Sequence, residues 1–339
     1  MRVLGISSGM GVSLYAFRKY VVGNVEPRPI FHTPGNIQWN LNYPGVRLEK
    51  TVEALKDLAD IDLIVSSPDC GSGSILRLSV AKKYGDYKNN PSLEAFFEGV
   101  NHFKPKIFYF ENLEGLFKSV SEDKFKALLN NGYRLIKHIA PVSNWGNSQI
   151  HRKRLIIIGV REDLSRKVDK FFKLPHLTEE HKTCLELYGD LDELSNEECL
   201  ELAHVRESMD ELTTIHSGRK IPNWQITEIW NKELKGKKRW EVQGRKFTTA
   251  PGVYRNRKKD YPATARKASR QYDHKGLMLT PRQLARIQGV PDHFRIYIDQ
   301  ERLGYWINKG RVLVTKTPPH EVSVWLRRKL EKLKTLNFI

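Results

Sequence analysis

Along the first 160 residues, short apolar runs alternate with segments of helical periodicity. Segments such as Arg2–Ile6, Asp62–Val65 and Arg154–Val160 are typical of strands that are buried on both faces. Amphipathic segments between them predict helices, and Pro91–Phe103 begins with a proline, which suits a first helical turn. This alternation indicates an α/β fold with a parallel sheet and crossover helices. We also predict helices at Val12–Tyr20, Thr51–Leu58 and Ser121–Asn130, and strands at Tyr20–Val25, Lys106–Phe110 and Tyr133–Ile139.

The alternation is lost between about residues 162 and 276. An acidic stretch that suits helices, Thr183–Leu212, comes first, and a basic stretch with short predicted strands at Arg245–Thr249 and Gly252–Arg255 follows. Helical patterns return at Thr280–Gln288 and His320–Leu333. We therefore predict one domain over residues 1–165, an inserted or second domain over 166–276, and a return to the first domain over 277–339.

The charge of the chain indicates the kind of partner it binds. The 339 residues carry a formal net charge of +18. Between Lys232 and Lys275 there are 15 Lys or Arg against 4 Asp or Glu, interleaved with Trp, Phe and Tyr. Basic residues that alternate with aromatic ones can hold phosphates and stack bases, so we expect a nucleic acid as the partner. The alternative is a solvated, lysine-rich surface.

The number of cysteines and the hydropathy of the chain indicate the cellular compartment in which the protein is expected. The three cysteines, Cys70, Cys184 and Cys199, are odd in number and far apart, so we expect neither a disulfide framework nor a metal site. No apolar stretch is long enough to cross a membrane, and the N-terminus lacks the pattern of a signal peptide. We expect a cytoplasmic protein, in a bacterium or in a virus-infected host cell.

Cys70 is the main candidate for chemistry. It follows an apolar run and the small residues of Ser66-Ser-Pro-Asp69, which predicts a cysteine at the carboxyl end of a buried strand. Open α/β sheets bind their ligands at that edge. The alternative is a core cysteine, because free cysteines are among the most buried residues.

Four other segments suit the same edge of the sheet. Leu4–Gly11 combines a strand with a glycine turn that lets a ligand approach the backbone, and Glu26 follows the second strand, where a carboxylate often accepts hydrogen bonds from ribose hydroxyls. Glu111 ends another buried strand and is a candidate proton donor. In Gln149–Arg154, two arginines alternate and are expected to project to one side.

Together these segments resemble the DNA (cytosine-5) methyltransferase family, in the family's order along nearly the whole chain. Leu4–Gly11 is similar to the family's glycine turn, Asp62–Ser74 to its Pro-Cys strand end, and Pro105–Leu116 to its Glu-Asn-Val motif. Gly146–Gly159 resembles its Gln-x-Arg-x-Arg motif, and Leu279–Asp292 is the most specific match. The resemblance implies a Rossmann-like sheet that binds S-adenosylmethionine, with a smaller target-recognition domain at 166–276.

The resemblance also implies roles for individual residues. Cys70 as thiolate would attack C6 of a flipped cytosine, Glu111 would hydrogen-bond the ring at N3 and the exocyclic amine, and Arg152 would hold O2. S-adenosylmethionine would supply the methyl group to C5. The cofactor residues implied are Ser8, Gly9, Met10, Gly11, Glu26, Pro27 and Pro68, and the DNA-binding residues are Arg77, Lys82, Lys83, Arg154, Arg245, Arg255 and Arg257.

The sequence departs from the family pattern at several positions. Asp69 and Gly71 flank Cys70 where the family has proline and glutamine, and an inward-facing Asp69 would raise the pKa of the thiol. Ser7 stands where an aromatic residue meets the adenine, Gln149 is one residue further from Arg152 than in the motif, and Val314–Thr317 replaces Gly-Asn-x-Val.

The expected function is therefore methylation of cytosine at C5 in double-stranded DNA by a monomer, with a restriction endonuclease as a partner in a restriction-modification system. Two alternatives stay open. One is modification of RNA or of an altered pyrimidine on the same scaffold. The other is a homologue that binds nucleic acid without turnover.

Overall fold

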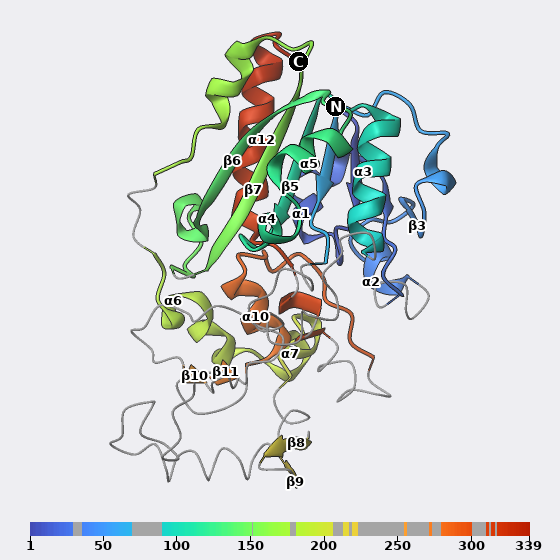
Figure 1. Cartoon of the computed structure of the whole chain (residues 1–339). Helices are drawn as coiled ribbons and strands as arrows, with labels where there is room; N and C mark the ends of the chain where they lie inside the picture. The colour runs from blue at the N-terminus through green and yellow to red at the C-terminus, as the bar shows by residue number, and fades with distance from the viewer. Residues whose placement is uncertain are drawn as a thin grey trace. The chain divides into compact units, whose positions relative to one another are not determined.

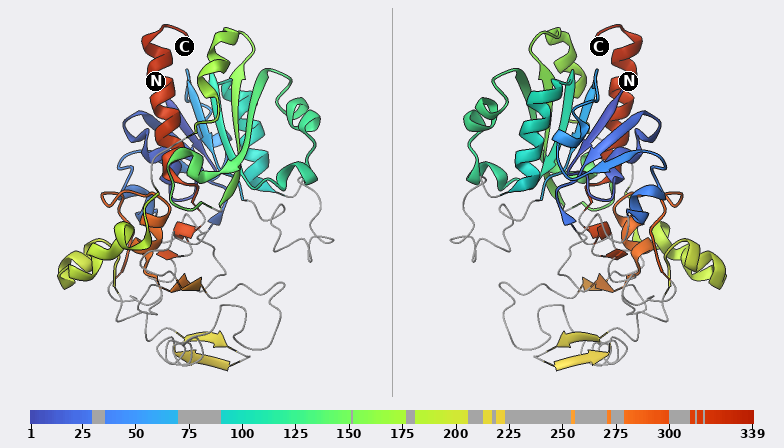
Figure 2. Two further views of the ribbon diagram at one scale, coloured as in Figure 1. Left: turned by 90° about the vertical axis from the view of Figure 1, so that its left-hand side faces the viewer. Right: turned by 90° about the vertical axis from the view of Figure 1, so that its right-hand side faces the viewer.

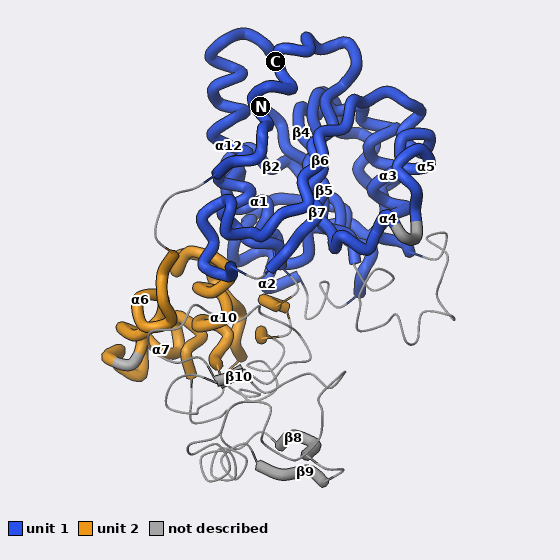
Figure 3. Tube along the Cα trace, turned by 60° about the vertical axis from the view of Figure 1, so that its left-hand side comes forward, with its two compact units in different colours: residues 1–179, 317–339 blue, residues 180–316 orange. Residues whose placement is uncertain are grey.

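The structure is a computed structural model that describes residues 1–29, 36–69, 90–150, 152–176, 181–205, 213–216, 219–222, 254–255, 271–272, 279–299, 310–311, 313–315 and 317–339. It divides into two compact units (Figure 3). Unit 1 comprises Met1–Glu179 and Thr317–Ile339, and unit 2 comprises Glu180–Lys316. These boundaries differ from the expected ones in two places. Residues 166–179 were expected in the second domain but belong to unit 1, and residues 277–316 were expected in the first domain but belong to unit 2.

In the described part of unit 1, seven strands form one sheet in the order β3-β2-β1-β4-β5-β7-β6 (Figure 1). The first five pair in parallel, whereas β7 runs antiparallel to both β5 and β6. The predicted parallel sheet is therefore mixed at one edge. The strands are β1 (Val3–Ile6), β2 (Val21–Val25), β3 (Arg47–Glu49), β4 (Leu63–Ser66), β5 (Ile107–Asn112), β6 (Tyr133–Pro141) and β7 (Lys153–Arg161).

Helices cover both faces of this sheet (Figures 1 and 2). On one face, α3 (Pro91–Phe103), α4 (Leu116–Ser119) and α5 (Glu122–Leu128) contribute to the main apolar core together with the strands. On the other face, α1 (Val12–Tyr15) packs with α12 (His320–Thr335). The short elements of unit 1 are α2 (Ile37–Asn40) and the 3-10 turns η1 (Arg18–Tyr20), η3 (Glu53–Leu55), η7 (Val142–Trp145) and η8 (Arg166–Phe172).

Helix α3 shows why the sequence folds as it does. Its bounds match the predicted Pro91–Phe103, and the side chain of Asn90 caps it by accepting the backbone N–H groups of Ser92 and Leu93. Proline at the first position loses no hydrogen bond. Phe96 is fully buried in the core, against the rings of Phe108 and Phe110 from β5. Burying an aromatic side chain of this kind stabilises the fold by roughly 1.5–3 kcal/mol.

Unit 2 contains shorter elements: α6 (Cys184–Tyr188), η9 (Gly189–Glu193), α7 (Asn196–Glu201), the hairpin β8 (Thr213–His216) and β9 (Arg219–Pro222), the parallel pair β10 (Tyr254–Arg255) and β11 (Gln271–Tyr272), and α10 (Pro281–Ile287). Thr280 caps α10 in a capping box. Arg282 on this helix is fully buried and donates to the carbonyls of Leu202, Pro291 and Phe294. These bonds tie three segments of unit 2 together.

Several predicted elements differ from the structure. The helix expected at Val12–Tyr20 is split into α1 and η1, and the one at Thr51–Leu58 is only η3. The described part of the acidic stretch is helical, as expected, in the short elements α6, η9 and α7. We did not predict α2, β3 or the β8–β9 hairpin. The strand predicted at 245–249 lies outside the described residues. Among the described residues, no helix is long and apolar enough to span a membrane.

Candidate active site

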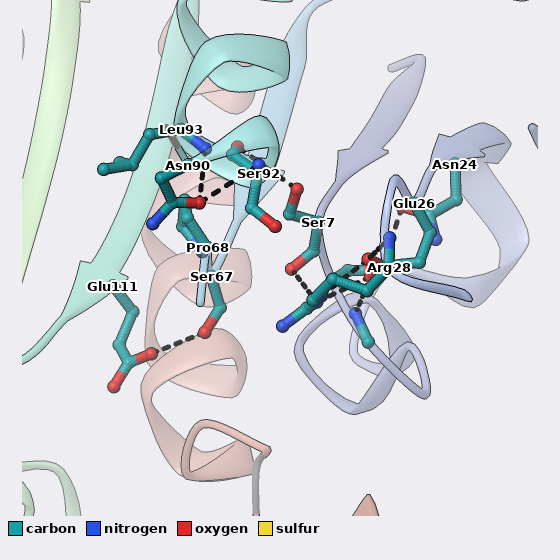
Figure 4. Close-up of polar contacts among 12 residues, drawn as sticks. Ser7, Asn24, Glu26, Arg28, Ser67, Pro68, Asn90, Ser92, Leu93 and Glu111 are labelled. Carbon is teal, nitrogen blue, oxygen red and sulfur yellow. Dashed lines mark hydrogen bonds and ion pairs between the residues drawn. The ribbon is translucent and has the colours of Figure 1, made fainter. Parts of the chain in front are cut away.

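The candidate site lies at the carboxyl ends of the parallel strands in unit 1. Strands β2, β1, β4 and β5 are neighbours in that order, so the segments that follow them meet at one edge of the sheet. This edge brings together the glycine turn, Glu26, the residues before Cys70, and Glu111 (Figure 4). Ligands of open α/β sheets bind in this place.

The turn after β1 has a conformation that requires glycine. Gly9 and Gly11 both have positive φ, 65° and 86°. A Cβ on Gly11 would come within 2.5 Å of the Tyr43 ring, and the Tyr43 hydroxyl donates to the Gly11 carbonyl. Only glycine fits at position 11 without strain, because its φ is positive and the Tyr43 ring fills the space that a side chain would take.

Glu26, just past β2, is a fully buried carboxylate with several partners. Its Oε2 accepts the backbone N–H of Gly9 at 2.8 Å and Nη2 of Arg28 at 2.6 Å. Its Oε1 accepts Nε of Arg28 at 2.6 Å and the backbone N–H of Arg28 at 3.1 Å. Arg28 therefore forms a bidentate ion pair with Glu26, which offsets the cost of burying the charge.

Glu111, near the end of β5, is the second buried carboxylate at this edge. The hydroxyl of Ser67 donates to its Oε2 at 2.6 Å, and Nε of Arg154 lies 2.9 Å from its Oε1. Tyr109, two residues earlier on the same strand face, is also buried. Burial, together with the charge of Glu111, holds the pKa of the Tyr109 hydroxyl well above its usual value.

The two residues before Cys70 are held by asparagine amides. Nδ2 of Asn112 donates to the carbonyl of Pro68 at 3.2 Å, and Nδ2 of Asn90 donates to the carbonyl of Asp69 at 3.0 Å. Asp69 is exposed. An inward-facing carboxylate at this position would raise the pKa of the Cys70 thiol, and exposure does not match that orientation. The chain is thus fixed up to the position immediately before Cys70.

The two arginines of the Gln149–Arg154 segment have different partners. Nη2 of Arg152, which is buried, donates to the carbonyl of Thr317 at 3.1 Å. Arg154, on β7, instead pairs with Glu111. Arg152 precedes the strand and binds the segment before α12. The expectation that both arginines project to one side of an extended segment stays a prediction.

Gln149 is fully buried, and its side chain donates to Oδ1 of Asn147 at 3.1 Å. The Asn147 amide in turn donates to both carboxylate oxygens of Glu321 on α12, each at 3.1 Å. These bonds hold the loop before β7 against the start of α12. They give Gln149 a structural partner that the sequence pattern did not predict.

Comparison with known proteins decides the family. The family model for C-5 cytosine-specific DNA methylases matches residues 39–307. The chain belongs to this family. Family membership makes this methylase a DNA cytosine-5 methyltransferase, and the resemblance inferred from the motifs is confirmed.

Relatives of this methylase are distant in sequence. It is 24% identical over 312 residues to the type II methyltransferase M.MthTI of Methanothermobacter thermautotrophicus, covering 85% of this chain and 84% of the relative. It is 23% identical over 331 residues to the type II methyltransferase M.FnuDI of Fusobacterium nucleatum, covering 90% and 88%.

Solved structures show the same fold. A prophage-encoded protein of E. coli, described as a DNA modification methyltransferase, aligns with a TM-score of 0.65 at 18% identity over 99% of both chains. The Dnmt2 methyltransferase of S. pombe aligns with a TM-score of 0.60 at 15% identity over the full length of both chains. The Rossmann-like α/β architecture expected from the sequence is therefore confirmed.

Some predicted site residues of the methylase lie outside the described part of the chain. Ser8, Gly9, Met10, Gly11, Glu26, Pro27, Pro68, Glu111, Arg152 and Arg154 are described, and all lie in unit 1. Cys70, Arg77, Lys82, Lys83, Arg245 and Arg257 are not described, and Arg255 is described only as backbone of β10. The roles predicted for these residues stay predictions.

Three residues of the site were missed in the sequence. Ser67 holds Glu111, Asn90 holds the carbonyl before Cys70, and Arg28 covers Glu26. A signal existed for Asn90, because asparagine followed by proline is typical of a helix start. The spacing of Arg28 two residues after Glu26 was also visible, but nothing in it distinguished a buried pair from a solvated one.

Proposed function

We propose that this methylase methylates C5 of a cytosine flipped out of duplex DNA, through a temporary covalent bond between Sγ of Cys70 and C6 of the base. The observation that carries the proposal is the position of Glu111. Its buried carboxylate is fixed by Ser67 and Arg154, and its neighbour Asn112 holds the chain two residues before Cys70. A nucleophile and an acid group would thus converge on one base.

The proposed reaction forms one bond to Cys70 and later breaks it. The Cys70 thiolate forms a bond to C6, and the electron pair of the C5–C6 double bond makes C5 nucleophilic. C5 takes the methyl group that S-adenosylmethionine would supply, which would leave S-adenosylhomocysteine. C5 then loses its proton to a base, and the Cys70–C6 bond breaks to restore the double bond and the thiolate. Extrusion of the base from the duplex costs a few kcal/mol.

Glu111 would hydrogen-bond the flipped base at N3 and the exocyclic amine, where charge accumulates when C6 is attacked. We assign the arginine beside the base to Arg154 instead of Arg152, because Arg154 is the one that contacts Glu111. Arg154 would hold the carboxylate in place and donate to O2. Arg152, bound to the Thr317 carbonyl, is proposed as a positioning residue for this loop.

The residues present fit S-adenosylmethionine. Gly9, which is partly exposed, brings no side chain of its own to the site, and the carboxylate of Glu26 lies where an acidic residue accepts ribose hydroxyls. The cofactor, when bound, supplies an electrophilic methyl group on a sulfonium. Ser8, Met10, Pro27 and Pro68 stand beside this turn or at the neighbouring strand ends, and we keep them in the proposed cofactor set.

DNA contacts are proposed for Arg77, Lys82 and Lys83 after Cys70, and for Arg245, Arg255 and Arg257 in the basic segment of unit 2. Lys and Arg that neutralise phosphates make such binding salt-dependent. We propose that the target-recognition domain expected over residues 166–276 is the part of this range that belongs to unit 2, residues 180–276, within a monomer in the cytoplasm. Because both reported relatives are named type II methyltransferases, a partner restriction endonuclease belongs to the proposal.

Transfer of labelled methyl groups from S-adenosylmethionine tests the function, with duplex DNA, single-stranded DNA and RNA as separate substrates. We expect incorporation into duplex DNA at C5 of cytosine, and its loss in Cys70→Ala. Cys199→Ala, which removes a partly exposed thiol in unit 2, is the matched control and should keep full activity.

Incorporation into RNA alone would contradict DNA as the substrate. Activity that survives in Cys70→Ala would contradict the proposed nucleophile. Binding of duplex DNA without any methyl transfer would favour a homologue that binds nucleic acid without turnover.

A further inference from the structure

The carboxylate of Glu26 is already saturated by the protein itself. A carboxylate offers about four lone-pair positions to donors. At Glu26 these receive the N–H of Gly9 and three N–H groups of Arg28, at distances between 2.6 and 3.1 Å. Figure 4 shows the Arg28 side chain lying against this carboxylate.

A ribose diol needs the same oxygens. The two hydroxyls of a cofactor ribose donate to a carboxylate at the end of the second strand. Since the Arg28 fork takes both oxygens of Glu26, the diol and the guanidinium cannot both be bound to them. Ribose binding therefore requires the Arg28 side chain to leave Glu26.

Leaving also breaks a second contact of Arg28. Its Nη2 donates to the carbonyl of Ser7 at 2.8 Å, in the turn that would hold the cofactor. Arg28 thus joins the two parts of the cofactor site, the turn after β1 and the carboxylate after β2. The closed arrangement is a competing state, and the affinity of a ligand falls in proportion to the population of the open state.

We propose that Arg28 is an internal competitor of the cofactor ribose and sets the affinity of this methylase for S-adenosyl compounds. The inference rests on the proposed function, namely that this site takes S-adenosylmethionine. Arg28 lies outside the glycine turn, two residues after Glu26. Removal of a charged side chain from the binding site should tighten binding.

Calorimetric titration with S-adenosylhomocysteine tests the proposal in the full chain. We expect Arg28→Ala to bind about 10-fold tighter than the unmodified protein, and Arg28→Lys, which loses the bidentate fork, to lie between them. Arg161→Ala is the matched control. Arg161 forms a bidentate pair with Asp163, which is likewise two residues away in sequence, but it lies at the last residue of β7, away from the strand ends that form the site. This control should leave the affinity unchanged.

A second ligand locates the effect. The 2′,3′-dideoxy analogue of S-adenosylhomocysteine has no diol to offer Glu26, so the gain in Arg28→Ala should disappear with it. Thermal unfolding gives an independent readout. Without ligand, Arg28→Ala should unfold at a lower temperature, because Glu26 loses a buried charge partner, and S-adenosylhomocysteine should raise that temperature more than it does in the unmodified protein.

The outcomes separate the two proposals. If the unmodified protein binds S-adenosylhomocysteine but Arg28→Ala and Arg28→Lys bind it equally or more weakly, the competitor role is wrong and the cofactor assignment stands. An equal gain with the dideoxy analogue would also overturn it. If no form of the protein binds S-adenosylhomocysteine, the proposed cofactor fails and this inference fails with it.

Discussion

Two carboxylates at one edge of the sheet, Glu26 and Glu111, each carry an arginine partner, but the arginines come from different places. Arg28 lies two residues from Glu26, outside any helix or strand. Arg154 lies on β7, where it pairs with Ala140 of β6, and the residues that follow it pair with both β5 and β6. The first pair is local, and the second is built by the sheet.

The difference bears on what each carboxylate can bind. Glu26 accepts at least four donors, three of them from Arg28. Among the described residues, Glu111 accepts one side chain on each oxygen, Ser67 and Arg154, and so keeps capacity for a base. A local partner can be exchanged for a ligand, whereas a partner anchored in a central strand orients the carboxylate and stays.

The largest expected effect comes from Glu111→Gln. An amide in place of the carboxylate keeps the shape but loses the acid, so kcat should fall by about 10²–10⁴-fold with the fold intact. Methyl-transfer rates and thermal unfolding check both parts. Glu114→Gln, at an exposed residue of the same segment, is the matched control. Near-normal kcat in Glu111→Gln would remove this residue from the chemistry.

The two arginines can be separated by a pair of variants. Arg154→Ala should lower kcat by about 10²-fold, because the base site loses a donor and Glu111 loses its partner. Arg152→Ala should act mainly on stability, by about 1–3 kcal/mol, because the Thr317 carbonyl loses a donor. Single-turnover kinetics and denaturant unfolding measure the two effects. The reverse pattern would restore Arg152 to the catalytic position.

A smaller effect is expected at Ser67. Loss of its hydroxyl removes one hydrogen bond from Glu111, so Ser67→Ala should lower kcat about 10-fold. Ser66→Ala is a close control, because the buried Ser66 hydroxyl has no hydrogen-bond partner among the described residues. Steady-state rates of the two alanine variants would decide the matter, and equal losses would mean that the segment matters only as packing.

The smallest effect is expected at Tyr109. Because burial and the Glu111 charge raise the pKa of its hydroxyl, Tyr109 stays protonated across the working pH range. Tyr109→Phe should therefore leave the shape of the pH–rate profile unchanged. A limb of that profile that disappears in Tyr109→Phe would show that the hydroxyl titrates during the reaction.

How much the sequence predicts depends on where the information lies. Helix α3 was predicted to the residue because its signals are local: a proline at the first position and an amphipathic pattern. The strand β3 was missed because it has three residues, Arg47–Glu49, and only one of them is apolar, which is too short for a pattern. The antiparallel direction of β7 is not encoded in a continuous apolar run.

The site shows the same limit. From the order of the motifs, Glu26, Glu111 and the glycine turn were predicted to lie at the same edge of the sheet, and the structure confirms that placement. Spacing could not say which of Arg152 and Arg154 reaches Glu111, because that depends on where β7 begins relative to β5. Nor could it tell that Arg28 is buried against Glu26, since charge pairs two residues apart are usually solvated.

The central claim is that the Glu111 end of this edge holds a base attacked by Cys70. The most direct measurement is peptide mapping of the methylase after reaction with S-adenosylmethionine and a duplex that contains 5-fluorocytosine. The fluorine cannot leave as a proton does, so the adduct should persist. We predict one protein–DNA adduct, on the peptide that carries Cys70. An adduct on Cys184 or Cys199, or normal methyl transfer to cytosine with no adduct on the fluorinated duplex, would contradict the account.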